Sequence, residues 1–382
     1  MAPFDFEPSA LVHVGATEPM ASVARATDPR FALVPDQSHY DGVYYYAIGR
    51  DPLARGREHT LIDRPSYRYG HPGFGWLGWL AAAGQAPALP YALLAVALAC
   101  AAIAGAAAAL LAADLGLSPL WGLAVAFNPG LVYSATVLTS EAAALAALLV
   151  ALLAWQRGHR VWAVAAMTIG CFVKEPLVLV PAGIAIYEIG NWLRTRSSLR
   201  ALFAQIGLLA VPPLIYLCWF VYLWWHFGLP PTDQSHDLAS IPFTGWVDTF
   251  KRASSSVGAD FSTSQLGAVE VALLVVVGFA LVLGTARAYR LDTVVKPVFV
   301  LMALTVFSLT WLNLLFPKDF LRAATVVLAL LPFVFAPGRP SEPLLQSDRG
   351  IWRKSSSRCP PTGPPGRFAR PWRRFRPESP TS

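Results

Sequence analysis

Charged residues are scarce in this sequence. Asp, Glu, Lys and Arg make up 14% of the 382 residues, hydrophobic residues make up 55%, and the mean hydropathy is +0.47. A soluble globular domain has about 25% charged residues. The composition therefore excludes an ordinary soluble protein and predicts an integral membrane protein.

Cysteine is also rare, and the motifs of several enzyme classes are missing. The four cysteines lie in apolar segments or in the tail and have no metal-type spacing: Cys100, Cys171, Cys218 and Cys359. This excludes a disulfide framework and a zinc site of the usual kind. There is no Walker loop, GxSxG, HExxH or CxxC motif, and the seven histidines are scattered. No metal site is predicted, and a requirement for a divalent metal stays open.

Most of the chain lacks an excess of positive charge. The formal net charge is +7, but residues 338–382 contain 10 Lys and Arg against 3 acidic residues, so the remainder has 20 of each sign. We therefore predict no nucleic-acid partner. The Pro-, Arg- and Ser-rich tail predicts a disordered cytoplasmic segment. Its arginines, with Trp352, Trp372 and Phe375, could also touch anionic headgroups, and a shifted reading frame would produce a similar segment.

The first 72 residues lack an apolar run near the ~20 residues needed to cross a bilayer. Their start, MAPFDFEPSA, has no signal-peptide pattern. Residues 73–83 are apolar but short, which predicts an interfacial or partly inserted helix. The sequence then predicts nine spans, near 90–113, 119–137 with a break at Asn128-Pro129-Gly130, 140–156, 160–173, 176–193, 201–227, 265–286, 295–316 and 320–337.

We therefore expect an all-α polytopic membrane protein in three parts. Residues 1–72 form an extracytoplasmic first-loop region with the catalytic motif, residues 73–337 form the transmembrane helical domain, and residues 338–382 form the tail. Short basic loops near 157–160, 194–200 and 287–296, with the loop near 114–118, mark the cytoplasmic side. To bring the first 72 residues to the opposite side, we expect a further spanning helix upstream of Met1.

The opposite side receives few charged groups, and Asp41 is the first of interest. It lies in Tyr40-Asp41-Gly42 and is followed by Tyr44 and Tyr45. An Asp-Gly pair is typical of a turn, and tyrosines are typical of a membrane-interface belt. Alternatively, a carboxylate shielded by aromatic rings has a raised pKa and serves as a general base. These local features alone favour the turn.

Later helices begin with further charged residues on the same predicted side. Glu141 in a first helical turn complements the helix dipole, which contributes ~0.3–1 kcal/mol at exposed sites. Glu175 could serve only as a helix cap. Lys174 near a helix start opposes the dipole, so it predicts a phosphate or carboxylate partner, and Arg322 is similar.

The order of these features resembles the GT-C superfamily. The features are YDGVYY at 40–45, an aromatic approach with Tyr69, Pro72 and Trp76, FNPGLVYSATVLTSEA at 127–142, and a basic residue at the start of a later span. GT-C proteins are polytopic glycosyltransferases that use polyprenyl-phosphate sugars. The sequence is most similar to mannosyltransferases of the glycosylphosphatidylinositol type and their bacterial relatives, over residues 39–190.

The resemblance implies a GT-C-like fold and an active site on the extracytoplasmic face of a bacterial cytoplasmic membrane. A sugar such as mannose would pass from a polyprenyl-phosphate donor to a glycan, lipid or protein acceptor. Asp41 would be the catalytic residue. The expected substrate-binding residues are Tyr40, Tyr44, Tyr45, Arg64, Arg68, Asn128, Ser140, Glu141, Lys174, Glu175 and Arg322.

Two other classes fit the composition. One is a membrane transporter or a flippase for lipid-linked substrates, and the other is a catalytically inert membrane subunit whose first region binds a partner. The glycosyltransferase hypothesis makes a geometric prediction that distinguishes it from the transporter and subunit hypotheses. Asp41, Glu141, Lys174 and Arg322 should line one outward cavity that opens to lipid.

Overall fold

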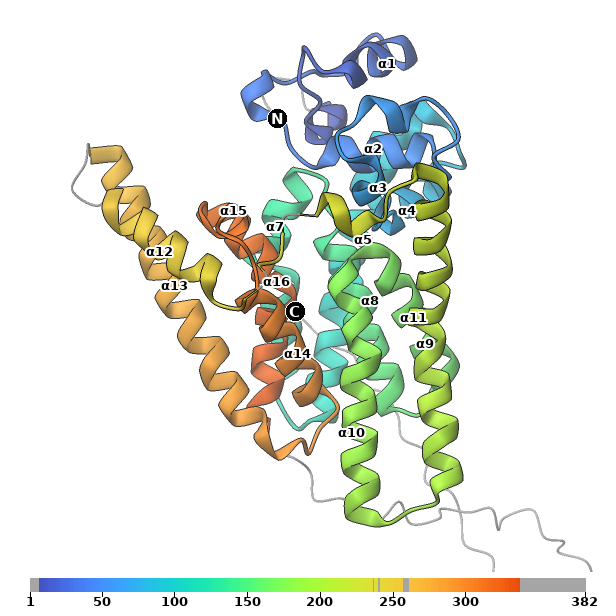
Figure 1. Cartoon of the computed structure of the whole chain (residues 1–382), viewed down its shortest axis with the longest axis vertical. Coiled ribbons are helices and arrows are strands. Elements are labelled where there is room, and N and C mark those ends of the chain that lie inside the picture. The colour runs from blue at the N-terminus through green and yellow to red at the C-terminus, as the bar shows by residue number, and fades with distance from the viewer. Residues whose placement is uncertain (1–6, 236, 240, 257–260, 337–382) are drawn as a thin grey trace, which may run out of the picture. The chain divides into compact units, whose positions relative to one another are not determined.

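Figure 1 shows the computed structural model of the chain, which describes residues 7–235, 237–239, 241–256 and 261–336. Within these ranges every regular element is a helix and there is no strand. The predicted all-α class is therefore confirmed for the described part of the chain. The predicted tail, residues 338–382, lies outside the described residues.

Four helical segments are long and apolar enough to cross a membrane. They are Ala86–Asp114, which contains α5 (Leu89–Asp114); Glu175–Thr195, which contains α10 (Leu179–Thr195); Leu199–Phe227, which is α11; and Gly267–Arg290, which overlaps α13 (Phe261–Arg287). Long, mainly apolar runs produce these helices, as the sequence predicts, although α10 contains Glu188 and α13 contains Glu270. They support a membrane protein, but nine spans are not confirmed.

Other predicted spans form shorter helices. Residues 140–156 and 160–173 form α8 (Glu141–Gln156) and α9 (Arg160–Val173), of 16 and 14 residues. At 1.5 Å per residue they extend about 24 and 21 Å, less than the hydrocarbon core of about 30 Å. Residues 119–137 form two helices, α6 (Trp121–Ala126) and α7 (Pro129–Thr136), with the predicted break between them.

The predicted span 295–316 is wrong as a single helix. It consists of α14 (Val295–Phe307) and the short α15 (Trp311–Leu314), and α16 (Pro317–Val334) follows. The carbonyls at the end of α14 accept hydrogen bonds from a distant loop: Ala239 N donates to Ser308 O, and Phe243 N donates to Phe307 O, both at 2.7 Å. These tertiary contacts satisfy carbonyls that the helix would otherwise use.

Helix α8 forms the centre of the bundle and packs between α5 and α9. Thirteen of its 16 residues are buried, because its alanine- and leucine-rich sequence is apolar on every face. By contrast, α11 and α13 expose large apolar side chains, including Trp225 at 80% and Phe279 at 68%. Such outward apolar faces suit contact with lipid.

The N-terminal block, residues 7–81, packs at one end of the bundle (Figure 1). It contains α1 (Pro19–Thr27), α2 (Gly42–Arg50), α3 (Pro65–Arg68) and α4 (Gly73–Ala81). Its own core includes fully buried Phe31, Tyr46 and Phe74. Helix α4, predicted to be interfacial, lies against α2 and α5.

Aromatic side chains along one face of α11 hold this block in place. Each of four residues forms a hydrogen bond with a backbone carbonyl of the block, at 2.6 to 2.9 Å: Tyr216 with Gly70, Trp219 with Tyr69, Tyr222 with Leu53 and His226 with Ala54. These bonds fix the segment from Asp51 to Pro72, which contributes to the cavity described below.

The basic loops gather at the opposite end of the bundle (Figure 1). There, Arg157 at the end of α8 pairs with Asp114 at the end of α5, at 2.8 Å. Arg194 at the end of α10 donates to the carbonyl of Arg290, at 3.3 Å. The predicted grouping of the loops into two ends is confirmed, and which end faces the cytoplasm stays a prediction.

Candidate functional site

A cavity of about 570 Å³ lies where the N-terminal block meets the bundle. Segments far apart in the sequence line it: α2, α3, the start of α8, the 3-10 helix η6 (Glu175–Val178), the end of α14, and α16. Ten of the twelve predicted site residues are among the lining residues: Tyr40, Asp41, Tyr44, Tyr45, Arg68, Ser140, Glu141, Lys174, Glu175 and Arg322.

A network of five charged side chains lines this cavity. Arg322 Nη1 lies 2.7 Å from Asp41 Oδ2, and Arg68 Nη1 lies 3.6 Å from Asp41 Oδ1. On the other side, Glu141 Oε1 lies 2.9 Å from Lys174 Nζ and 3.6 Å from Arg322 Nε. Among these five, three cations face two carboxylates, and Asp63, outside the cavity lining, adds a third carboxylate at 3.3 Å from Arg68 Nε, so the charges balance formally.

Asp41 lies in the predicted turn, where Tyr40 O accepts the amide hydrogen of Val43 at 3.3 Å, but its side chain does not behave as either local interpretation predicted. It precedes α2, but its side chain makes no capping bond to a backbone amide. Burial alone would raise its pKa, but the guanidiniums of Arg322 and Arg68 outweigh burial and hold the pKa below its usual value. The alternative prediction, a raised pKa, is therefore wrong. The side chain keeps 32% of its surface exposed because it faces the cavity.

Glu141 and Lys174 form the second half of the network. Glu141 is 3% exposed and also accepts a hydrogen bond from Ser134 Oγ at 3.0 Å, so it is not an exposed complement to the helix dipole. The anionic partner predicted for Lys174 is the Glu141 carboxylate. Lys174 also directly follows α9, where the negative end of the helix dipole favours a cation.

The tyrosines of α2 are part of the site and do not form an interface belt. Tyr44 and Tyr45 are buried, and the Arg68 guanidinium stacks on the Tyr44 ring, 3.6 Å from its centroid. Tyr45 donates to Ser140 Oγ at 2.9 Å, and Tyr40, just before the helix, donates to Asp319. Burial raises the pKa of Tyr40, Tyr44 and Tyr45, so these hydroxyls remain protonated.

Two predicted site residues lie outside the cavity. Arg64 is on the surface, with 43% of its side chain exposed and Asp63 at 3.8 Å. Asn128 caps α7, because its side chain accepts the amide hydrogen of Gly130 at 2.9 Å. Neither position supports the predicted substrate contact.

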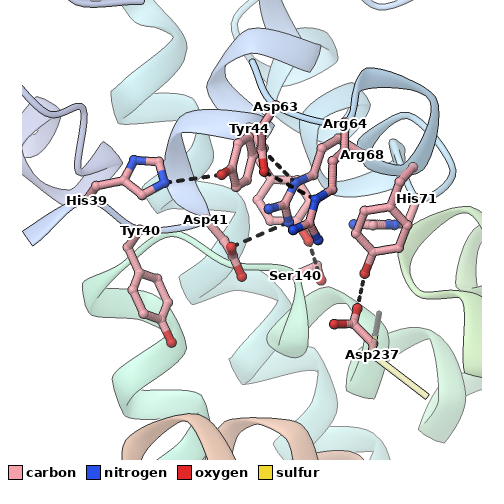
Figure 2. A network of polar contacts seen from close by, with 12 residues as sticks. His39, Tyr40, Asp41, Tyr44, Asp63, Arg64, Arg68, His71, Ser140 and Asp237 are labelled. Carbon is pink, nitrogen blue, oxygen red and sulfur yellow. Dashed lines mark hydrogen bonds and ion pairs between the residues drawn. The ribbon is translucent and has the colours of Figure 1, made fainter. Parts of the chain in front are cut away.

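The structure adds lining residues that sequence reasoning missed. His71 Nδ1 lies 3.0 Å from Glu175 Oε1, Tyr67 donates to Asp237, and Asn313 donates to Asp237 Oδ1 at 3.2 Å. Figure 2 shows His71 and Asp237 on the side of Arg68 away from Tyr40. Asn313 carried one signal, since it is a polar residue inside a predicted span.

One wall of the cavity is apolar. It is formed by Met302 and Val306 of α14 and by Val326 and Val327 of α16, with Leu177 of η6 also lining the space. The charged network therefore opens onto a surface that suits a hydrocarbon chain. Such a combination fits an amphipathic ligand with an anionic head.

Within the described ranges, no group of three or more His, Cys, Asp or Glu side chains could hold a metal ion. Comparisons of the chain with family models, curated proteins and solved structures find no match. The resemblance to GT-C glycosyltransferases therefore stays a hypothesis, and the roles of the cavity residues are argued from their geometry.

Proposed function

We propose that this protein is an integral membrane glycosyltransferase. It transfers a sugar such as mannose from a polyprenyl-phosphate donor to a glycan, lipid or protein acceptor on the extracytoplasmic side. The observation that carries the proposal is one cavity that brings three cationic side chains, held by carboxylates, next to an apolar wall. A polyprenyl-phosphate sugar has two parts that match this cavity: an anionic phosphate, which suits the cations, and a hydrocarbon chain, which suits the apolar wall.

The cations have a direct role in such a reaction. As the bond between the sugar and the phosphate breaks, negative charge grows on the phosphate, and fixed positive groups stabilise it. Arg322, Arg68 and Lys174 supply that charge, and carboxylates balance it in the resting site: Asp41, Glu141 and Asp63. A single displacement at the anomeric carbon then inverts its configuration.

Asp41 has two possible roles in this scheme. As an ionised carboxylate it can accept the proton of the attacking hydroxyl, or it can hold the guanidiniums of Arg322 and Arg68 in position. Both roles require its negative charge. Replacement by the neutral, nearly isosteric asparagine therefore removes function while preserving shape.

The test is transfer of labelled mannose from polyprenyl-phosphate mannose by the purified protein in proteoliposomes that contain membrane acceptors. We expect transfer by the wild type and a loss of at least about 100-fold in Asp41→Asn. Asp28→Asn, in the same block but outside the cavity lining, is the matched control. Unfolding temperature confirms that each variant is folded.

The same proteoliposomes distinguish the glycosyltransferase from the two alternative functions, a flippase and an inert subunit. Movement of the sugar lipid across the bilayer without transfer would identify a flippase. Neither movement nor transfer, with any polyprenyl-phosphate sugar tested, would favour an inert subunit. A fully active Asp41→Asn would remove Asp41 from the mechanism.

A further inference from the structure

A histidine–glutamate pair lines the same cavity but lies outside the charged network. His71 Nδ1 is 3.0 Å from Glu175 Oε1, and the two side chains are 12% and 39% exposed. The backbone beside His71 is fixed, because the carbonyl of Gly70 accepts the Tyr216 hydroxyl at 2.9 Å. The pair therefore presents a defined geometry to the cavity.

This geometry selects one tautomer of His71. An ionised carboxylate only accepts hydrogen bonds, so Nδ1 carries the hydrogen and Nε2 carries the lone pair. Within the described part of the chain, no group hydrogen-bonds Nε2. A neutral imidazole in this state can accept a proton, and Glu175 stabilises the imidazolium that results.

The carboxylates of the network are less suited to accept a proton. The two oxygens of Asp41 face Arg322 and Arg68. Both oxygens of Glu141 are also occupied, one by Lys174 and the other by the Ser134 hydroxyl. These partners stabilise the ionised forms and oppose protonation.

The tyrosines that surround His71 are not bases either. The Tyr67 ring lies 5.2 Å from the His71 ring and the Tyr45 ring lies 6.3 Å from it, between centroids. Burial raises the pKa of both phenols, so they stay protonated and act as donors. With Glu175, these are the titratable groups that form a hydrogen bond or a ring contact with His71 among the described residues.

We propose that His71, oriented by Glu175, accepts the proton of the acceptor hydroxyl, and that Asp41 holds the guanidiniums that bind phosphate. This inference rests on the proposed function. The acceptor oxygen forms a bond to the anomeric carbon while the carbon–oxygen bond to phosphate breaks. The phosphate leaves with that electron pair, and the hydroxyl proton moves to Nε2 of His71.

The kinetic test compares three variants in the mannose-transfer assay. His71→Ala should lower kcat by at least about 100-fold with the KM for the sugar lipid unchanged, and added imidazole should restore part of the rate. Glu175→Gln should lower kcat by about 10-fold through misorientation of the ring, and Glu175→Asp should recover part of it. Glu175 is thus a positioning residue.

His59→Ala is the matched control. His59 forms a similar pair with Asp51, at 3.1 Å, but neither residue lines the cavity. It should keep the wild-type kcat and show no response to imidazole. Wild-type kcat in His71→Ala, or a loss that imidazole does not relieve, would overturn the role of His71.

A second measurement needs no turnover. Diethyl pyrocarbonate should modify His71 in the folded wild type, as detected by mass spectrometry, and bound polyprenyl-phosphate mannose should protect it. An unreactive or unprotected His71 would overturn the inference. Failure of the proposed function has a different signature, because the wild type itself would then transfer no sugar.

Discussion

At the scale of single residues, the site is stabilised by ion pairs that share partners. Glu141 is 3% exposed and contacts both Lys174 and Arg322, and Arg322 continues to Asp41. Removing one member leaves a buried charge with too few partners, which costs more than removing a matched pair. Substitutions in this network should therefore be strongly non-additive.

Lys174→Met should lower the free energy of unfolding by about 2 kcal/mol, because it removes the closer cation from the buried Glu141 carboxylate. The double variant Lys174→Met with Glu141→Gln should be more stable than Lys174→Met alone. Thermal and denaturant unfolding in detergent measure both. Strictly additive effects would show that the pair is not coupled.

Asp41 should make stability depend on acid pH. Its pKa is lowered in the folded state, so its ion pairs contribute stability above the unfolded pKa of about 3.9, and the contribution is lost as pH falls through the folded pKa. Wild type should therefore exceed Asp41→Asn in unfolding temperature at pH 7, and the difference should shrink below about pH 4. A difference that does not change between pH 7 and pH 3 would contradict this assignment.

At the scale of elements, the site depends on how closely α7 approaches α16. Gly130 in α7 lies against α16, and a Cβ atom there would come within 2.6 Å of the Leu321 carbonyl oxygen and would overlap the Thr325 hydroxyl. Backbone cannot move aside as a flexible side chain can. Arg322 follows Leu321 directly, so this contact also sets the position of a network cation.

Gly130→Ala should therefore destabilise the protein by about 2 kcal/mol and should also reduce transfer of labelled mannose, because α16 must shift. Gly190→Ala in α10 is the matched control, since a Cβ atom at Gly190 meets nothing within 4 Å. The control should be neutral or slightly stabilising. Equal unfolding temperatures for the two variants would argue against the close approach of α7 and α16.

At the scale of the whole molecule, the charged cavity and the basic loops lie at opposite ends of the bundle. If the four long apolar helices cross a bilayer, these two ends must face different aqueous compartments. Because of their charge, we predict that the basic loops face the cytoplasm.

Single cysteines test this arrangement in a background without the four native cysteines. Thr60→Cys, in an exposed part of the N-terminal block, should react with a membrane-impermeant maleimide added outside intact cells. Ser198→Cys, in the exposed loop between α10 and α11, should react only after the membrane is opened. Labelling of both from one side would contradict the orientation, and labelling of the two in reversed order would place the cavity in the cytoplasm.

The sequence by itself determined the helical class and the long spans. Helices α5, α10, α11 and α13 follow from long, mainly apolar runs, whose helix formation depends on local composition. It also predicted that the loops divide between two ends, and that Lys174 needs an anionic partner. Both predictions depend on charges and on the order of elements along the chain, and both of these can be read from the sequence alone.

Only the tertiary structure decided which groups form the site. Asp41 and Arg322 are separated by 281 positions, and their 2.7 Å contact exists because the residues before α2 and the first turns of α16 line the same cavity. The same contact, with Arg68, lowers the pKa of Asp41. Hydrogen bonds from Ala239 and Phe243, more than 60 positions away, accompany the division of the predicted span 295–316. Ion pairing and hydrogen bonding depend on distance in space, which sequence patterns do not encode.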